Sequence, residues 1–351
     1  MFDYTVFIGR FQPIHNGHLN ILREALTRSK RLILLVGSAN RARDIRNPWA
    51  YQERCDMINS CLTLAEKSRI FYAPLPDYLY QDGAWVENVQ KIVYNVIEQS
   101  KENHSPTVAL IGHSKDNTSY YLNLFPQWRS IEIDDVTGLN STDIRKIIFS
   151  NKFDYSTLVS IGVPIAISQY LIHWSLHQND IYNDLVYEAN FVKNYKEQWK
   201  TKKDGGQVPY PVIFQTTDAV VEQSGHILMI VRGDSPGKGQ LALPGGFLEY
   251  NLTLRENMLK ELREETQLKV PEPVLIGSIV AEHTFDAVHR STRGRTITHS
   301  TYIKLQDRPE LPKVKGGSDA KKALWIPRGK IKAENLFEDH FFILNYFLGL
   351  K

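Results

Sequence analysis

Short runs of β-branched and aliphatic residues alternate with helical patterns throughout the first half of this 351-residue chain. Such alternation is typical of βαβ units, whose strands lie parallel in one open sheet between two layers of helices. We therefore predict an α/β fold with a doubly wound parallel sheet. The expected strands are Val6–Ile8, Leu32–Val36, Ile70–Tyr72 and Val108–Ile111; the expected helices include Leu19–Ser29 and Glu53–Leu64, and a helical pattern continues from Phe153 to Trp174.

The pattern changes between Gln178 and Gly206, where the sequence becomes polar and aromatic and ends in Asp-Gly-Gly. We interpret this segment as a helical connector that closes in a Gly-rich linker. The length of the chain suits two domains, so we predict the organisation 1–177, 178–206 and 207–351. In the last part we expect a mixed α/β domain with strands at Val212–Phe214, Asp218–Val221 and His226–Val231 and a helix at Thr253–Thr266.

The charge of the chain is nearly balanced, with 42 basic and 39 acidic residues and a formal net charge of +3. This balance does not call for a nucleic-acid or membrane partner. The two cysteines form neither a disulfide framework nor a zinc pattern and suit a reducing compartment. No apolar run approaches the roughly 18 residues needed to span a bilayer, and the N-terminus lacks signal-peptide features. We therefore expect a cytoplasmic protein.

The segment from Gly9 to His18 directly follows the first expected strand and precedes the first expected helix. In a doubly wound sheet, ligands bind at the carboxyl ends of the strands, where a helix N-terminus presents free N–H groups. His15 and His18 can direct both imidazoles to one place there, and Arg10 adds a positive charge. The alternative is a surface loop with two solvated histidines, but the position after the first strand favours an anion site.

His15-Asn16-Gly17-His18 resembles the His-x-Gly-His motif of the nucleotidylyltransferase superfamily. Late in the same half, Leu139–Arg145 resembles its second motif, Ile-Ser-Ser-Thr-x-Ile-Arg, with Asn140 in place of a serine. Further stretches around Arg46, Trp85 and Gly112 resemble the nicotinamide mononucleotide (NMN) adenylyltransferase branch. The resemblance covers about residues 1–170 and implies a Rossmann-like domain.

The reaction that this resemblance implies has no covalent enzyme intermediate: the phosphate of NMN attacks the α-phosphorus of ATP, and pyrophosphate leaves. His15 and His18 would hydrogen-bond phosphate oxygens, Arg10, Arg46 and Arg145 would surround the triphosphate, and Mg²⁺ would shield the leaving group. Trp85 would stack on the nicotinamide ring. The implied catalytic residues are His15, His18, Arg10 and Arg145, and the implied ATP and NMN contacts are Gly9, Arg10, His15, His18, Arg46, Trp85, Gly112, Ser141, Thr142 and Arg145.

Three glutamates in the second half, Glu261, Glu264 and Glu265, are spaced i, i+3 and i+4, which places them on one face of a helix. Carboxylates gathered in this way repel one another unless they are solvated or bound to divalent cations, and oxygen donors suit Mg²⁺ or Mn²⁺. A solvated acidic helix face is the alternative. The pair Gly245-Gly246, which precedes the helix by a few residues, favours the metal site over the solvated face.

The segment from Gly246 to Leu268 resembles the Nudix box, Gly-x5-Glu-x7-Arg-Glu-U-x-Glu-Glu-x-Gly-U, in which U is aliphatic. The resemblance implies an α/β/α sandwich with a mixed sheet, metal binding by Glu261, Glu264 and Glu265, and catalysis by Glu261 and Glu265. Three positions depart from the box: Leu252 replaces the first Glu, Lys260 the Arg and Gln267 the last Gly.

A basic stretch downstream, from Arg290 to His299, suits a pyrophosphate-containing substrate beside a metal site. With Gly316–Ala320 and Phe337–His340, it resembles the Nudix half of bifunctional NMN adenylyltransferase/ADP-ribose pyrophosphatases. The implied activity is hydrolysis of ADP-ribose to AMP and ribose 5-phosphate, with substrate contacts from Gly245, Gly246, Arg290, Arg293 and Arg295.

The sequence therefore predicts an enzyme of NAD metabolism that acts on ATP, NMN and ADP-ribose with Mg²⁺ or Mn²⁺ in both domains. Two alternatives stay open. One keeps both activities but changes the substrates to nicotinate mononucleotide or another nucleoside diphosphate derivative. The other makes the Nudix domain a sensor that binds its ligand without hydrolysis. The sequence also leaves a homo-oligomer open.

Overall fold

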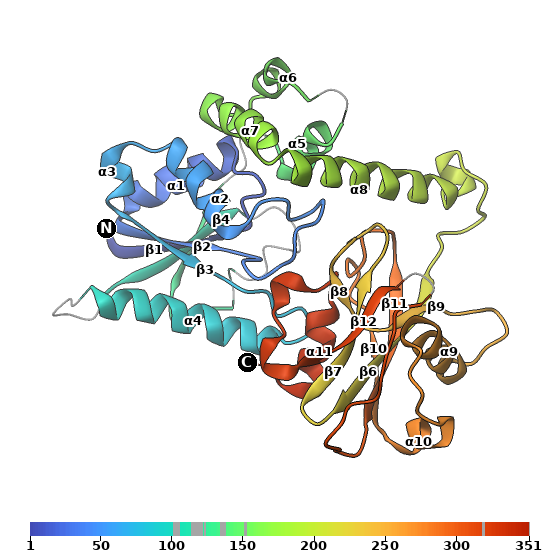
Figure 1. Ribbon diagram of the computed structural model, residues 1–351. Helices are drawn as coiled ribbons and strands as arrows, with labels where there is room; N and C mark the ends of the chain where they lie inside the picture. Colours follow the sequence, from blue (N-terminus) through green and yellow to red (C-terminus); the bar gives the residue numbers. More distant parts are fainter. Residues whose placement is uncertain are drawn as a thin grey trace. The chain divides into compact units, whose positions relative to one another are not determined.

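The structure is a computed structural model, and it describes residues 1–100, 106–113, 122, 124–133, 138–150, 153–317 and 320–350. The chain divides into two compact units, Met1–Val186 and Tyr187–Lys351, and the division falls inside α8 (Asn179–Gln198) (Figure 1). This helix lies within the segment that we expected to be a helical connector. Among the described residues, no helix is long and apolar enough to cross a membrane.

The first unit is built on a five-stranded sheet in which every paired strand is parallel. The strand order is β3-β2-β1-β4-β5. The chain adds β2 and β3 on one side of β1 and then crosses to add β4 and β5 on the other side. The order reverses between β1 and β4, which is where such sheets bind ligands. The strands are β1 (Phe2–Gly9), β2 (Ser29–Val36), β3 (Ile70–Pro74), β4 (Val108–His113) and β5 (Arg129–Ile133).

Helices follow the strands as the alternating pattern predicts. The structure has helices over most of the segment from Phe153 to Trp174, as predicted, but with a break. Gly162 takes a left-handed φ of 88°, and Pro164 cannot continue the hydrogen-bonding pattern of the preceding helix. The segment therefore forms two helices, α6 and α7. The helices are α1 (Asn16–Arg28), α2 (Tyr51–Ser60), α3 (Leu64–Lys67), α4 (Asp82–Gln99), α5 (Ser141–Ile148), α6 (Tyr155–Ser160) and α7 (Ile165–His177).

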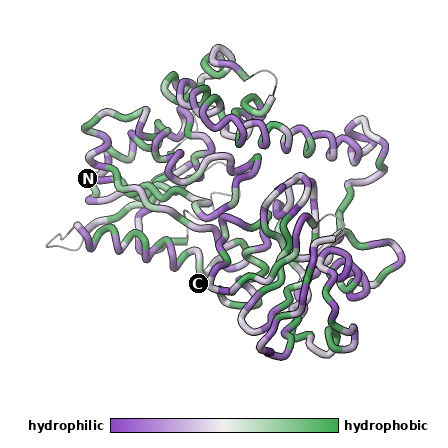
Figure 2. The backbone as a smooth tube through the Cα atoms, viewed as in Figure 1, coloured by the Kyte–Doolittle hydropathy of each residue, from purple (hydrophilic) through white to green (hydrophobic). Residues whose placement is uncertain are grey.

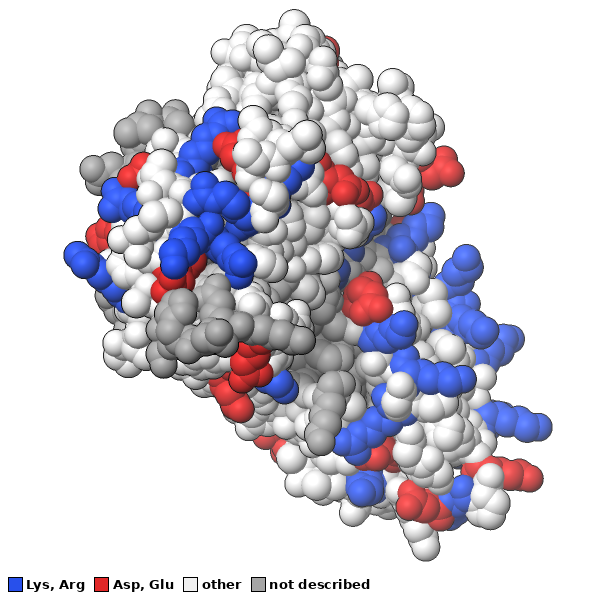
Figure 3. Space-filling view, turned by 90° about the vertical axis from the view of Figure 1, so that its left-hand side faces the viewer, with Lys and Arg blue, Asp and Glu red and all other residues white. Residues whose placement is uncertain are grey.

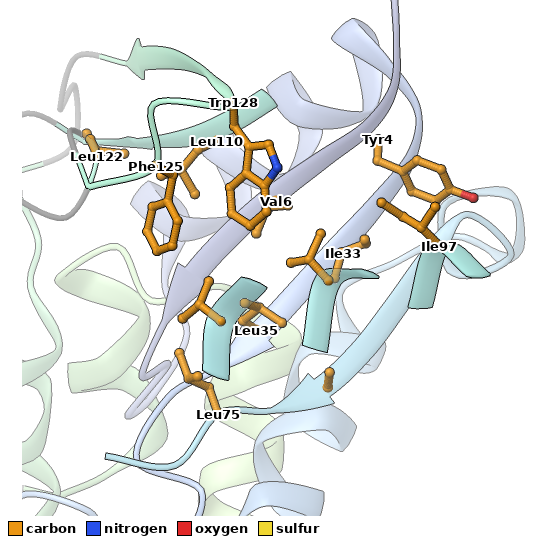
Figure 4. Close-up of a cluster of buried hydrophobic side chains, with 13 residues drawn as sticks. Tyr4, Val6, Ile33, Leu35, Leu75, Ile97, Leu110, Leu122, Phe125 and Trp128 are labelled. Atoms are coloured by element: carbon orange, nitrogen blue, oxygen red, sulfur yellow. The ribbon is translucent and has the colours of Figure 1, made fainter. Parts of the chain in front are cut away.

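A buried apolar cluster joins one face of this sheet to α4 (Figure 4). Tyr4 and Val6 of β1 and Ile33 and Leu35 of β2 alternate along their strands, so they share that face. Full burial of such a side chain contributes roughly 1.5–3 kcal/mol. The facing stripe of α4 has helical spacing and consists of Val89, Val93 and Ile97.

The second unit contains a mixed seven-stranded sheet with the path β10-β11-β6-β7-β12. β11 and β6 are parallel and the other pairs are antiparallel. The separate strand predicted at Val212–Phe214 is wrong, because one continuous strand runs from Phe214 past the predicted Asp218–Val221. The strands are β6 (Phe214–Gln223), β7 (His226–Arg232), β8 (Leu241–Ala242), β9 (Gly245–Phe247), β10 (Ile279–Phe285), β11 (Thr296–Lys304) and β12 (Ala320–Pro327).

α9 (Leu254–Thr266) is the helix that carries the three glutamates. It begins with a capping box, in which Thr253 accepts the N–H of Glu256 and the Glu256 side chain accepts the N–H of Thr253. Its apolar side, with Met258 and Leu262, packs on the sheet. α10 (Glu272–Gly277) and α11 (His340–Leu348) complete the unit.

Hydropathy follows this architecture, since hydrophobic residues concentrate along the inner strands and polar residues along the outer loops and α8 (Figure 2). On the face seen in Figure 3, basic and acidic side chains both occur on the surface, in keeping with the small net charge of +3. Bulk charge therefore does not define a binding surface, and the sites must be found from local geometry.

Two candidate active sites

The loop after β1 brings His15 and His18 together. His15 caps α1: its Nδ1 accepts the backbone N–H of Gly17 at 3.2 Å, which satisfies one of the free N–H groups at the helix start. The two imidazole centroids are 4.0 Å apart. Phe11 has a left-handed φ of 51°, and a Cβ on Gly9 would lie 2.6 Å from its ring, so the sharp turn requires glycine there.

Buried polar contacts fasten this loop to the neighbouring segments. The Gln12 amide binds both backbone groups of Trp49: its Nε2 donates to the carbonyl at 2.9 Å and its Oε1 accepts the N–H at 3.1 Å. The buried Arg54 donates to the carbonyl oxygens of Arg10 at 2.7 Å and Gly37 at 2.6 Å. The loop is therefore held in one conformation from two sides.

The start of α5, late in the sequence of this unit, contacts the loop after β1. Arg145 is buried and donates to the carbonyl of Gln12 at 2.5 Å and to the hydroxyl of Thr142 at 3.2 Å. The Ser141 hydroxyl donates to the carbonyl of Pro13 at 2.9 Å. Asn140 caps the helix, accepting the N–H of Asp143 at 2.9 Å, so the departure from serine preserves the cap.

Three guanidinium groups gather around this loop. Burial is the main cause that lowers the pKa of Arg145 to about 10, and the charges of Arg10 and Arg46 lower it further, opposed by Asp44. These arginines come from three separate stretches of sequence. Their mutual repulsion is relieved when an anion binds among them, so this arrangement suits a polyphosphate.

Trp85 and Gly112 lie on other elements of the unit. Trp85, in the first turn of α4, is half-buried and packs against the apolar cluster, with its ring 6.1 Å from that of Phe125. Gly112 is near the carboxyl end of β4, one residue after the pair that joins Ile111 to β1. The motif residues 114–116 lie outside the described part of the chain.

A pocket in the second unit opens beside Gly245 and Gly246. A Cβ on Gly245 would lie 2.2 Å from a carbonyl oxygen of β6, and one on Gly246 would lie 2.6 Å from the Glu261 carboxyl carbon. Side chains are therefore excluded at both positions. The acidic residues Asp218 and Glu338 also line the pocket.

Glu265 of α9 is buried next to Gly245, one of the residues that line this pocket. Its carboxylate accepts the N–H of Gly245 at 2.8 Å. Burial raises its pKa to about 8, against the effect of that hydrogen bond, and the neighbouring charges of Glu261 and Asp218 raise it further. Burial and the two neighbouring acidic residues disfavour the charged form of this carboxyl group, and a bound divalent cation would favour it.

Glu264 does not join the other two glutamates. Its carboxylate binds Lys260 at 2.8 Å, and Lys260 also binds Glu249 at 2.9 Å. Within the described residues, no three histidine, cysteine, aspartate or glutamate side chains lie close enough to hold a metal ion. The predicted set of three glutamates is thus divided, because Glu265 interacts with Glu261 and Asp218 whereas Glu264 pairs with Lys260.

The three predicted arginines have three different environments. Arg290 lines the pocket but is buried in a two-bond pair with Asp339, both bonds 2.8 Å long. Arg293 lies over the ring of Phe247, 5.0 Å from its centroid, and lines the pocket. Arg295 instead binds the backbone carbonyl of Asp286 and is not part of the pocket lining.

Several pocket residues were not among the predicted site residues. Arg232 lies 4.0 Å above the ring of Phe337, and both face the pocket with Phe247. His340 is buried and accepts the N–H of Leu243 at 2.8 Å. Their positions depend on contacts between segments that are far apart in the sequence, and only the motif Phe337–His340 was singled out from the sequence.

Comparisons with known proteins match each unit separately. The family model described as Cytidylyltransferase-like matches residues 6–156, and the NUDIX domain model matches residues 214–346. A nicotinamide/nicotinic acid mononucleotide adenylyltransferase of Acinetobacter baylyi is 36% identical over 185 residues, which cover 52% of this chain and 92% of that protein. This relative corresponds in length to about the first half of the chain.

The crystal structure of a bifunctional NMN adenylyltransferase/ADP ribose pyrophosphatase from Francisella tularensis matches the whole chain. The identity is 34%, the TM-score is 0.88, and 99% of each chain is covered. The chain belongs to this bifunctional family. A second structure of the Francisella type, complexed with AMP and a manganese ion, matches with a TM-score of 0.86 at the same identity and coverage.

Membership of this family confirms the predicted fold class, with an N-terminal Rossmann-like domain on a parallel sheet and a C-terminal Nudix domain on a mixed sheet. It also confirms the predicted pairing of nucleotidyltransferase and Nudix hydrolase domains in one chain. The roles of individual site residues are not tested by these comparisons and stay predictions.

Proposed function

We propose that the chain is a bifunctional enzyme of NAD metabolism. Its first unit transfers the adenylyl group of ATP to NMN, giving NAD and pyrophosphate. Its second unit hydrolyses ADP-ribose, giving AMP and ribose 5-phosphate. The names of relatives that match half or all of the chain support both activities.

The transferase proposal depends above all on the convergence of Arg10, Arg46 and Arg145 around the loop after β1. In the proposed reaction, a phosphate oxygen of NMN forms a bond to the α-phosphorus of ATP as the bond to the pyrophosphate oxygen breaks. The arginines would neutralise the negative charge that gathers on the phosphates, and His15 and His18 would donate to phosphate oxygens. No side chain acts as a nucleophile in this proposal.

Further contacts in the first unit follow from the same proposal. Ser141 and Thr142 would offer hydroxyls at the start of α5, and Gly9 and Gly112 would let the nucleotide approach the strand ends. Trp85 would stack on the nicotinamide ring. The name of the Acinetobacter relative includes both nicotinamide and nicotinic acid mononucleotides, so nicotinate mononucleotide is the second candidate substrate.

The hydrolase proposal depends on the pocket beside Gly245 and Gly246. The oxygen donors of Glu261 and Glu265, with Asp218 nearby, fit Mg²⁺ or Mn²⁺. The pKa of Glu265 is raised first by burial and then by the neighbouring charges of Glu261 and Asp218, both of which a cation would offset. A bound divalent cation would activate a water molecule and neutralise the diphosphate. The protein's own residues would bind the substrate, with Arg232 and Arg293 facing its diphosphate and Gly246 leaving room beside Glu261.

A sensor function for the second unit is the competing proposal. The attachment of Glu264 to Lys260 favours it, because a glutamate expected at the metal is held elsewhere. The buried Glu265 beside Glu261 and Asp218 favours hydrolysis, since a site for binding alone has no need of carboxylates that are costly to bury.

Two assays on the purified chain with Mg²⁺ test these proposals. With NMN and ATP, we expect equal amounts of NAD and pyrophosphate; absence of NAD would refute the transferase proposal. With ADP-ribose, we expect AMP and ribose 5-phosphate, whereas binding without turnover would establish the sensor. Nicotinate mononucleotide in place of NMN measures substrate preference.

Some predictions concern the protein as a whole. We retain the domain organisation 1–177, 178–206 and 207–351 as a proposal, although the division of the structure at Val186 places the end of α8 with the second unit. Residence in the cytoplasm, a metal ion in the first unit and a homo-oligomer likewise stay predictions. Gel filtration with light scattering would determine the oligomeric state.

A further inference from the structure

A buried carboxylate on α8 contacts the second unit's pocket loop. Glu188 is only 8% exposed, and its Oε2 accepts the backbone N–H of Gly237 at 3.1 Å. Val192, one turn further along the same face of the helix, is also buried. Both ends of this hydrogen bond belong to the second unit. The last part of α8 is therefore packed against residues that follow it by about 50 positions.

The loop that Glu188 holds connects β7 to β8, from residue 233 to 240. Gly237 takes a left-handed φ of 75°, and a Cβ there would lie 2.3 Å from the ring of Phe337. Arg232, at the start of the loop, donates its Nε–H to the carbonyl of Pro236 at 2.8 Å and lies 4.0 Å above Phe337. Movement of the loop would thus disturb both Arg232 and Phe337.

We propose that Glu188 is a positioning residue for the hydrolase site, which it serves without touching the substrate. By fixing the amide of Gly237, it keeps the 233–240 loop against Phe337 and keeps Arg232 directed along the pocket wall. This inference rests on the proposed hydrolase function, because Arg232 and Phe337 matter to catalysis only if the pocket binds ADP-ribose.

Loss of the acceptor should weaken substrate binding more than it slows the chemical step. A buried N–H without an acceptor is unfavourable, so the loop would shift to find another partner. Arg232 would contact the substrate before and during the reaction, and loss of such uniform binding raises KM while kcat changes little. We expect a rise in the KM for ADP-ribose of about 10-fold with a change in kcat below about 3-fold.

Two variants of similar volume separate hydrogen bonding from packing. Glu188→Met fills the same space but has no acceptor for the Gly237 N–H, whereas Glu188→Gln keeps an oxygen acceptor. Glu197→Ala is the matched control, because this glutamate lies on the same helix but is exposed and binds only Lys200 in the contacts seen, at 2.6 Å. All variants are made in the full chain, so unchanged NMN adenylylation shows that the first unit is unaffected, and a kcat for ADP-ribose near the wild-type value shows that the second unit is folded.

Hydrogen exchange of the 233–240 peptide and ADP-ribose kinetics are measured on each variant. We expect faster exchange and a raised KM in Glu188→Met, with values near wild type in Glu188→Gln and Glu197→Ala and unchanged NAD synthesis in all three. An unchanged exchange rate of the 233–240 peptide in Glu188→Met would overturn the proposal that Glu188 fixes this loop. Faster exchange with an unchanged KM would overturn the positioning role.

The same experiment distinguishes failure of the proposed function. If the wild-type chain does not turn over ADP-ribose, the hydrolase proposal fails and the positioning role fails with it. If wild type is active and Glu188→Gln behaves like Glu188→Met, hydrogen bonding to Gly237 is not the cause, and the inference is refuted while the hydrolase proposal stands.

Discussion

The ammonium group of Lys260 lies 2.9 Å from a carboxylate oxygen of Glu249. In the Nudix box, the position of Lys260 belongs to an arginine and that of Leu252 to a glutamate. Here the acidic partner comes from three residues earlier in the chain, so a basic and an acidic residue still meet beside α9. The changes at positions 252 and 260 therefore keep an acid–base pair, now formed by Glu249 and Lys260. Lys260 in addition binds Glu264.

Removing this lysine should strengthen metal binding. Lys260 carries a positive charge beside the proposed site and competes with the metal for Glu264. In Lys260→Gln we expect the Mg²⁺ concentration for half-maximal ADP-ribose hydrolysis to fall about 2–5-fold, a modest change because the groups are partly solvated. Arg263→Gln is the control, since Arg263 lies on the same helix and pairs with Glu272. A higher Mg²⁺ requirement would show that Lys260 supports the site instead.

Arg145 should not tolerate replacement by lysine. Its guanidinium binds both the carbonyl of Gln12 and the hydroxyl of Thr142, and a lysine cannot reproduce this planar geometry. We expect Arg145→Lys to lower kcat/KM for ATP by roughly 10²-fold, by analogy with the loss of one donor that stabilises developing charge. Steady-state NAD synthesis measures it. Arg23→Lys, on an exposed surface pair, should change nothing, and equal effects in the two variants would count against the proposed role.

The two sites should fail separately. Each unit has its own compact core, and the proposed residues of each site lie within one unit. We therefore expect His18→Ala to abolish NAD synthesis and leave ADP-ribose hydrolysis within about 2-fold, and Glu265→Gln to do the reverse, because independent sites do not share mutational effects. Both activities are assayed on each variant. Loss of both activities in either one would contradict independent sites.

Features encoded in short stretches of sequence were predicted well. The strands β1 to β4 follow from local hydropathy, and the His15–His18 loop follows from its place after a strand. Spacing on a helix correctly placed the three glutamates on α9. Close approach explains the two glycines before it, since Gly245 lies against the backbone of β6 and Gly246 against Glu261.

Features that depend on distant contacts were not predicted. Asp218 read only as part of a strand, and its place in the pocket arises because β6 pairs with β9 next to Gly245. The partner of Lys260 was also missed, because Glu249 lies in an irregular loop whose path no periodicity reveals. Arg295 looked equivalent to Arg293 in sequence, but its contact with Asp286 removes it from the pocket.

Glycine at position 267 should stabilise the second unit. Gln267 ends α9 with a left-handed φ of 50°, a conformation that glycine adopts without strain, and the Nudix box has glycine there. We expect Gln267→Gly to raise the free energy of unfolding by about 0.5–1 kcal/mol. Urea unfolding measures this change. Gln267→Ala keeps the strain and should bring no gain, so equal stabilisation by alanine would refute the explanation.

His340 should make the second unit sensitive to acid. Burial lowers its pKa below the ordinary value of 6.5, although the charges of Asp218 and Asp339 oppose this. Its Nδ1 accepts the N–H of Leu243, so protonation there would replace an acceptor with a second donor. Below about pH 6.5 the unfolded chain takes up a proton that the folded state refuses, and stability falls as the pH decreases.

The pH dependence should disappear when this histidine is replaced. Asparagine offers an oxygen near the position of Nδ1 but does not titrate, so His340→Asn should be less stable than wild type at pH 7.5 because it leaves a cavity. The difference should shrink below pH 6.5, by at most about 1.4 kcal/mol per pH unit. Urea unfolding at pH 7.5, 6.5 and 5.5, with hydrogen exchange of peptides from β7 and α11 as the probe of the second unit, measures this stability difference. Parallel loss of stability in both proteins would assign the acid sensitivity to another group.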